Sequence, residues 1–174
     1  MALILDGTTG IVANNIADYA ISTAKLANSA ITTAKIGYAG AVLQVVQAQS
    51  TTTITTTTTT YSDLMSASIT PTSSTSKIFA IWSMGIFTTA GAIPELQLVR
   101  NSTSISVNGF WGHINGGGAY ILNYPASMYL DSPATTSSTT YKLQGRTRSG
   151  TVNWMYTDGN GQLVGTLTLM EIAG

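Results

Sequence analysis

The chain has 174 residues, seven of them basic and seven acidic, and a formal net charge of zero. It is long enough for one well-cored domain with an extension, and it lacks the basic surface that nucleic acid or anionic lipid would need. Cysteine is absent, which excludes disulfide bonds, zinc-thiolate sites and thiol nucleophiles.

Residues 1–6 are a short apolar patch with no basic flank, so they do not resemble a signal peptide. We expect a disulfide-free, soluble protein that is made in the cytoplasm.

Residues 11–40 contain an internal repeat with a period of ten residues. Within it a large aliphatic residue recurs at every fifth position, and small residues such as Ala24 and Ala34 hold fixed places between them. The aliphatic positions are Ile11, Ile16, Ile21, Leu26, Ile31 and Ile36.

A five-residue spacing fits neither the period of a helix nor the alternation of a strand, so one regular element could not bury these side chains on one side. The segment also has too little apolar surface to fold alone. We expect it to pack against identical copies around a symmetry axis, either as kinked helical turns or as extended chains that wind together. The alternative is an alanine-rich helix that lies on the domain that follows.

From residue 41 onward the pattern changes to short strands. Residues 42–47 predict a strand, and the run of nine threonines in 51–60 predicts a flexible loop or a polar edge strand. Residues 61–70 predict another strand and 71–76 a turn. The apolar residues 78–87 number about half of what a membrane span needs, so we expect a buried strand over 77–87.

The remaining chain alternates strands with turns. Predicted strands cover 95–100 (half-exposed), 104–110, 120–130, 141–148, 152–156 and 163–172, and predicted loops cover 113–119, 133–139, 149–150 and 158–161. Seven to nine short strands with no long helix predict a mainly β domain, a jelly-roll-like β-sandwich.

Catalytic and metal-binding residues are not identified in the sequence. The single histidine, His113, has no carboxylate near it in the chain, and the seven carboxylates are scattered. One histidine without cysteine does not make a zinc site within one chain, and residues 158–161 predict a turn rather than a calcium loop. We therefore expect a protein that is not an enzyme and needs no cofactor.

Aromatic residues gather around the glycine-rich loop 113–119, with Trp154 and Tyr156 on a later strand. Most of them are expected to pack in the core or between subunits. The functional alternative is a surface for a host glycan or protein, in which aromatic faces stack and amides and hydroxyls supply hydrogen bonds. The candidates for this receptor-binding surface are Trp111, His113, Asn115, Tyr120 and Tyr124.

The chain resembles bacteriophage tail-fibre and related virion-fibre proteins. The resemblance lies in the segment from Leu5 to Ile11 and in the Ile-Ser/Thr-Thr-Ala-Lys-Leu/Ile repeats at 21–26 and 31–36. It also includes strand and loop segments of the later domain, such as 42–47, 69–78 and 167–172. It implies a homotrimer with a β-sandwich head, and it implies no catalytic residue.

This resemblance and the repeat together give three expected parts: a virion attachment segment at 1–10, a repetitive trimerising stalk at 11–40 and a β-sandwich head at 41–174. The expected function is that of a structural fibre or spike subunit of the virion, exposed on the particle and contacting the host surface and other virion proteins. The alternatives are a capsid head-fibre or decoration protein, a carbohydrate-binding module that acts alone, and a polysaccharide depolymerase that would depend on a carboxylate such as Asp131.

Overall fold

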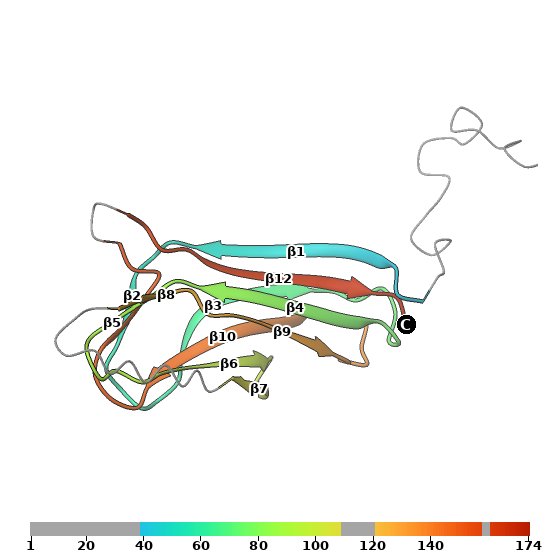
Figure 1. Cartoon of the computed structure of the whole chain (residues 1–174). Helices are drawn as coiled ribbons and strands as arrows, with labels where there is room; N and C mark the ends of the chain where they lie inside the picture. The colour runs from blue at the N-terminus through green and yellow to red at the C-terminus, as the bar shows by residue number, and fades with distance from the viewer. Residues whose placement is uncertain (1–38, 109–120, 158–160) are drawn as a thin grey trace, which may run out of the picture. The chain divides into compact units, whose positions relative to one another are not determined.

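The computed structural model describes residues 39–108, 121–157 and 161–174 (Figure 1). Within these ranges every regular element is a β-strand, which confirms the mainly β prediction. The described part contains no helix of the length and hydropathy that a membrane crossing requires. The six aliphatic positions of the expected stalk, from Ile11 to Ile36, lie outside the described residues.

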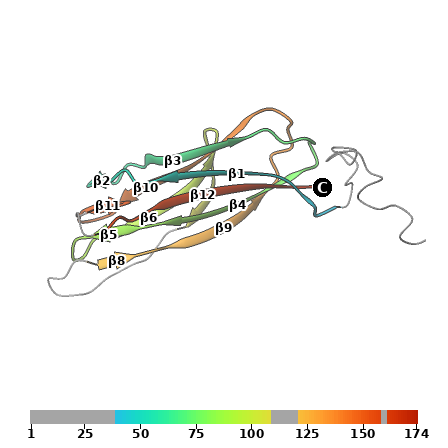
Figure 2. The same ribbon diagram turned by 90° about the horizontal axis from the view of Figure 1, so that it is seen from above.

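Two four-stranded antiparallel sheets form the body of the head (Figures 1 and 2). The first sheet has the order β1 (Val42–Ser50), β12 (Gly165–Ile172), β4 (Lys77–Met84), β9 (Ala126–Asp131). The second has the order β3 (Ser62–Ile69), β10 (Thr139–Thr147), β6 (Pro94–Arg100), β7 (Thr103–Asn108).

This strand order is that of a jelly roll. Counted along the chain as first to eighth, the eight long strands form one sheet in the order 1-8-3-6 and another in the order 2-7-4-5. These are the two sheets of an eight-stranded jelly roll, whose Greek-key connections pass from one sheet to the other. The predicted jelly-roll-like sandwich is therefore confirmed.

A third, smaller sheet lies at one end of the sandwich. Its order is β2 (Ile54–Thr56), β11 (Val152–Trp154), β5 (Ile86–Thr88), β8 (Ile121–Asn123). In Figure 1 it lies at the left, whereas the C-terminus and the start of β1 lie at the right. We call the end with the small sheet the distal end and the other the proximal end.

The proximal end is closed by the backbone. The amide of Gly40 donates to the carbonyl of Ala173 at 2.8 Å, and the amide of Ala173 donates to the carbonyl of Ala41 at 2.8 Å. The chain therefore enters the sandwich and leaves it at the same place.

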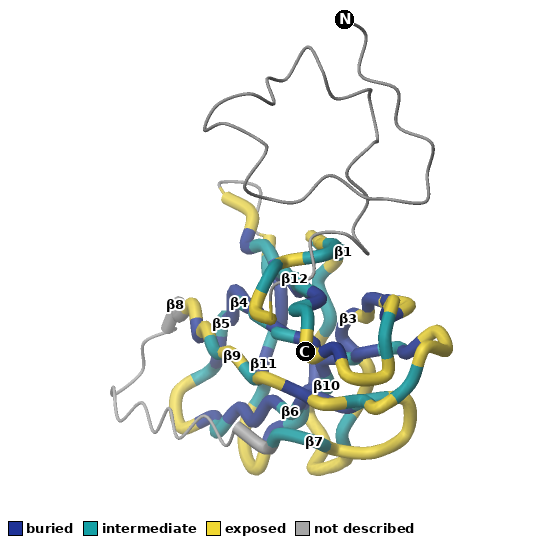
Figure 3. The backbone as a smooth tube through the Cα atoms, turned by 90° about the vertical axis from the view of Figure 1, so that its right-hand side faces the viewer, coloured by how far each residue is buried: buried dark blue, intermediate teal, exposed yellow. Residues whose placement is uncertain are grey.

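The core lies between the two large sheets, where the inward side chains of each strand meet. On β12, Leu167 and Leu169 are fully buried, and Thr166 and Thr168, which alternate with them, are not. Figure 3 shows buried residues along the inner strands, with exposed residues in the turns and on edge strands such as β1. This alternation is the expected result of a pleat with one face toward the core.

Two predicted strands are divided in the structure. The strand expected over 77–87 is interrupted at Gly85, whose amide donates to the carbonyl of Val164 at 3.1 Å and whose carbonyl accepts the amide of Met155 at 2.7 Å. A side chain at this position would lie 2.5 Å from Cβ of Leu163. The strand expected over 120–130 is interrupted at Tyr124 and Pro125, where the carbonyl of Pro125 accepts the amide of Met84 at 2.9 Å.

The burial of two regions also differs from expectation. Residues 95–100 were expected to be half-exposed, but β6 lies inside its sheet, and Glu95 is only 3% exposed. The expected buried strand over 77–87 has only one buried face along β4, since Phe79 and Ile81 are half-exposed. In the threonine run, Ile54–Thr56 forms an edge strand of the small sheet, one of the two structures expected there.

Candidate functional site

Of the five predicted receptor-binding residues, only Tyr124 falls among the described residues. It follows β8 and is 53% exposed. The other four, Trp111, His113, Asn115 and Tyr120, lie outside the described residues, and their grouping stays a prediction.

The described residues add an aromatic pair at the distal end. The rings of Phe87 on β5 and Tyr156 after β11 stack with their centroids 4.3 Å apart and their planes 9° from parallel. Both side chains are half-exposed, so the pair presents aromatic surface rather than filling the core.

Polar side chains lie in the same row of the small sheet as Phe87. Asn153 on β11 is paired with Thr55 on one side and with Phe87 on the other. The hydroxyl of Thr55 donates to Oδ1 of Asn153 at 2.7 Å. We name the four residues Thr55, Asn153, Phe87 and Tyr156 the distal platform.

Trp154 holds this strand in place from the inner side. It is fully buried, and its indole Nε1 donates to the hydroxyl of Thr56 at 2.9 Å. Because neighbours on a strand point to opposite faces, a buried Trp154 places Asn153 outward. Trp154 is thus a core residue, as expected for most of the aromatics, whereas Tyr156 lies at the surface.

The chemistry of the distal platform suits an uncharged, hydroxyl-rich ligand. Flat aromatic faces pack against the C–H side of a sugar ring, and an amide with a hydroxyl can both donate and accept hydrogen bonds. Phe87 was missed in the sequence because it belongs to the apolar run 77–87. The sequence carries no signal that places it outward, because the two residues beside it that turn inward are the apolar Ile86 and the polar Thr88.

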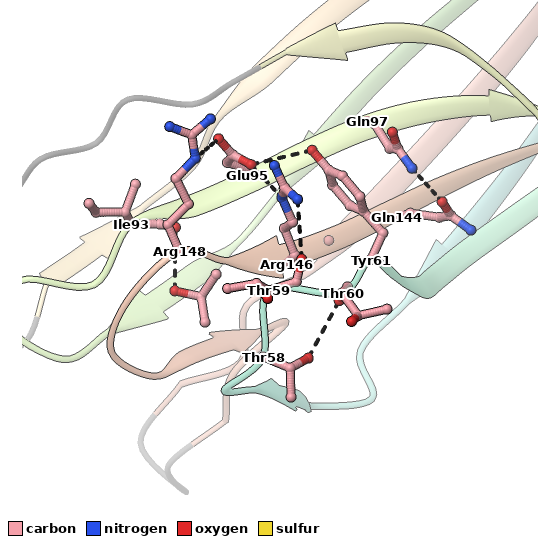
Figure 4. Close-up of polar contacts among 12 residues, drawn as sticks. Thr58, Thr59, Thr60, Tyr61, Ile93, Glu95, Gln97, Gln144, Arg146 and Arg148 are labelled. Atoms are coloured by element: carbon pink, nitrogen blue, oxygen red, sulfur yellow. Dashed lines mark hydrogen bonds and ion pairs between the residues drawn. The ribbon is translucent and has the colours of Figure 1, made fainter.

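Glu95 is the centre of a buried charge cluster (Figure 4). Its carboxylate accepts from the Nε atoms of Arg146 and Arg148, each at 2.5 Å. The guanidinium of Arg146 also lies 4.5 Å from the ring centre of Tyr61, and burial raises the pKa of Tyr61. Two guanidinium groups on one carboxylate join the start of β6 to the end of β10, so the cluster has a structural role.

Asp131, the carboxylate considered for a depolymerase, is held in the same way. Nη1 of Arg100 lies 2.8 and 2.9 Å from its two oxygens, and the hydroxyl of Tyr141 donates to it at 2.6 Å. Burial, followed by the hydrogen bond to Asp131, raises the pKa of Tyr141 well above its ordinary value. Asp131 therefore ties β9 to the second sheet.

The two other described carboxylates have donors of their own. Asp63 accepts from Lys142 at 2.8 Å, and this bond lowers its pKa. Burial alone would raise the pKa of Glu171, but hydrogen bonds from Gln44 at 2.6 Å and Thr72 at 2.7 Å hold it below its ordinary value. Over the described ranges, no three histidine or carboxylate side chains are grouped to hold a metal ion.

Comparison with known proteins gives distant structural likenesses. No family model matches the chain. No curated protein matches it in sequence. Among solved structures, the VP2 subviral particle of infectious bursal disease virus is similar with a TM-score of 0.48 and 15% identity over 75% of this chain and 33% of that one. The Gx strain of the same virus gives a TM-score of 0.47 and 17% identity over 75% of this chain and 33% of that one.

A third similar structure is dimeric latent PorU from Porphyromonas gingivalis, with a TM-score of 0.32 and 14% identity over 78% of this chain and 14% of that chain. This chain thus spans about a third of the length of these two viral proteins and 14% of the length of PorU. At these scores the likeness indicates no shared function, and the jelly-roll assignment rests on the strand order of this chain alone.

Proposed function

We propose that the chain is a homotrimeric structural subunit of a bacteriophage fibre or spike. Residues 1–10 attach it to the particle, residues 11–40 form the trimerising stalk, and residues 41–174 form a head that contacts the host surface. Its role is binding and assembly, with no catalytic residue and no cofactor.

The observation that carries this proposal is that the two ends of the sandwich differ. The chain enters beside Gly40 and leaves beside Ala173 at the proximal end, and the distal platform lies at the opposite end. In a fibre, the end that is joined to the stalk faces the particle, and the free end faces the host. A recognition surface at the free end is what this arrangement favours.

A surface glycan is the ligand class that we propose for the distal end. The distal platform is uncharged and combines a stacked aromatic pair with an amide and a hydroxyl. The segment with Trp111, His113, Asn115 and Tyr120 lies between β7 and β8, and β8 is the strand next to β5 in the small sheet. We propose that these residues extend the same binding surface.

Binding of the fluorescent full-length chain to host cells and to a glycan array tests the ligand class. Loss of the stacked ring in Tyr156→Ala should weaken binding about two- to thirteenfold, since such a contact contributes about 0.5–1.5 kcal/mol. Ser66→Ala, on an exposed position of β3, is the matched control and should bind normally. Unchanged binding of Tyr156→Ala would remove the distal platform from the proposed site.

Two measurements test the assembly. Light scattering on the purified chain should give the mass of a trimer at micromolar concentration, and a stable monomer would contradict the proposal. An antibody against the head should label the tail of intact particles. Label on the capsid would instead identify a head-fibre or decoration protein.

A further inference from the structure

The outer face of the first sheet is apolar at its proximal end. One row across the sheet joins Val45, Met170, Phe79 and Leu130, and the next includes Ile81 and Met128. The exposed fraction is 64% for Met128, 56% for Val45 and 51% for Leu130. We name the set the apolar face; its members are Val42, Val45, Phe79, Ile81, Met128, Leu130, Met170 and Ile172.

The apolar face ends partway along the sheet. In the second row Gln47 donates to the hydroxyl of Thr168 at 2.9 Å, and one row farther the hydroxyls of Ser83 and Thr166 are 2.9 Å apart. The outward side chains thus become polar toward the distal platform. The apolar part is the part next to the entry of the chain.

The outer face of the second sheet is built differently. There Lys142 pairs with Asp63 at 2.8 Å, Gln97 donates to Gln144 at 2.6 Å, and Ser68 faces Thr140. This is the polar surface expected of a sheet that faces water. The contrast within one chain indicates that the apolar face is covered in the working protein, since exposed apolar patches of this kind mark interaction surfaces.

The sequence itself gives the same indication. The largely apolar run at 78–87, broken only by Ser83 and Gly85, is typical of a strand that is buried on both faces. A single chain buries only the inner face of β4 and leaves Phe79 and Ile81 half-exposed. A second layer on the outer face would complete the burial.

We infer that the apolar face is the contact between heads in the homotrimer, with the same face of three copies turned toward the three-fold axis; the inference rests on the proposed function. A symmetric contact brings identical side chains together, so it disfavours charge near the axis. Among the described residues of these rows, Lys77 is the single charged one, and it lies at the proximal margin.

The dimensions of the sheet fit three copies. Strands about 4.8 Å apart make a four-stranded face about 19 Å wide. The centre of a triangle with sides of about 19 Å lies about 5.5 Å from each side, close to half of the roughly 10 Å between packed sheets. The side chains of three such faces therefore fill the space around the axis without a channel.

Continuity with the repeat also favours copies of the chain as the partner. Residues 11–40 lead directly into β1, whose first residues, Val42 and Val45, belong to the apolar face. The aliphatic residues of the repeat need identical partners for their burial. A second copy of the chain is therefore a partner that would serve both the repeat and the apolar face.

Cysteine labelling of the full-length chain tests the inference, because the natural sequence contains no cysteine. Met128→Cys and Val45→Cys place one thiol on the apolar face, and Ser66→Cys places one on the exposed face of the second sheet as the control. Each variant is analysed by light scattering, by its rate of maleimide labelling and by cross-linking with a flexible bismaleimide.

In the trimer, the thiols of Met128→Cys and Val45→Cys should react at least about tenfold more slowly than that of Ser66→Cys, because reaction requires access. They should also cross-link chains, and the control should not. If Met128→Cys is no longer a trimer but keeps the circular dichroism spectrum of a folded β protein, that result would support the same contact.

Labelling at the control rate in a protein that is still trimeric would overturn the head contact and leave the trimer standing. Slow labelling without links between chains would overturn it too, because the cover would then come from residues 1–38 of the same chain. A wild-type monomer would instead overturn the proposed function.

Discussion

Gly145 on β10 is a position where one added methyl group should destabilise the fold. A Cβ there would lie 2.7 Å from Cδ1 of Leu64 and 2.7 Å from Cζ2 of Trp154, where ordinary contact is 3.4–4 Å. Leu64 can change rotamer, but Trp154 is fully buried and its indole is held by Thr56. The sheet must therefore shift by several tenths of an ångström.

Overpacking of this kind lowers the free energy of unfolding by about 1–3 kcal/mol. Because the ring of Trp154 cannot move away, we expect a loss of about 2–3 kcal/mol for Gly145→Ala. For a head of this size that corresponds to a fall of roughly 6–12 °C in Tm. Urea denaturation at one fixed protein concentration measures the free energy of unfolding, because dissociation of a trimer makes stability depend on concentration.

The matched control for this prediction is Gly161→Ala. A Cβ at Gly161 would have nothing within 4 Å, so the variant should unfold like the wild type. Equal stability of Gly145→Ala and Gly161→Ala would refute the reasoning, since it would mean that the core around Trp154 has room for a methyl group.

Three further predictions concern buried polar groups. Wild-type protein should lose stability as the pH falls below the ordinary Glu171 pKa of 4.5, because the unfolded state then binds more protons, and Glu171→Gln should lose less in urea denaturation at low pH. Arg100→Met leaves the buried Asp131 short of a donor and should cost about 1–3 kcal/mol in urea at neutral pH; no loss would contradict the role of the ion pair. Because the pKa of Tyr141 is raised in the fold, wild type should lose stability as the pH rises above 10.0, and thermal melts of Tyr141→Phe should show a smaller loss.

Most of the fold could be predicted because strand patterns are local. The alternation in β10 and over 165–169 of β12 places every second residue in the core, and the sequence shows that period directly, whereas over 170–172 the polar Glu171 is the inward residue. The break at Gly85 could not be predicted, since it depends on the backbone near Leu163, far along the chain. The pairing that makes a jelly roll likewise joins strands that the sequence does not connect.

The charge clusters were beyond prediction for the same reason. Arg146 lies 51 residues from Glu95, and Gln44 lies 127 residues from Glu171. Scattered carboxylates in the sequence carried no sign of these partners. Only the folded sheets bring each acid to its donors.

The candidate site was predicted in part. The sequence placed Trp154 and Tyr156 two positions apart on one predicted strand, where alternation would put both side chains on the same face. In the structure Met155, with a φ of 52°, interrupts that alternation, so Trp154 is fully buried and Tyr156 is half-exposed. The outer face of β4 was assigned to a buried core. An apolar run does not reveal whether the layer that packs on its outer face belongs to the same chain or to another.

The position of β12 has a consequence for the order of folding during synthesis. The last strand of the chain lies between β1 and β4, and it pairs Met170 with Val45. The first sheet therefore cannot close until residues up to 172 have left the ribosome, and pairings so distant in the chain form slowly. The N-terminal repeat emerges long before that point, so the association that we propose for it would begin while the sandwich is still open.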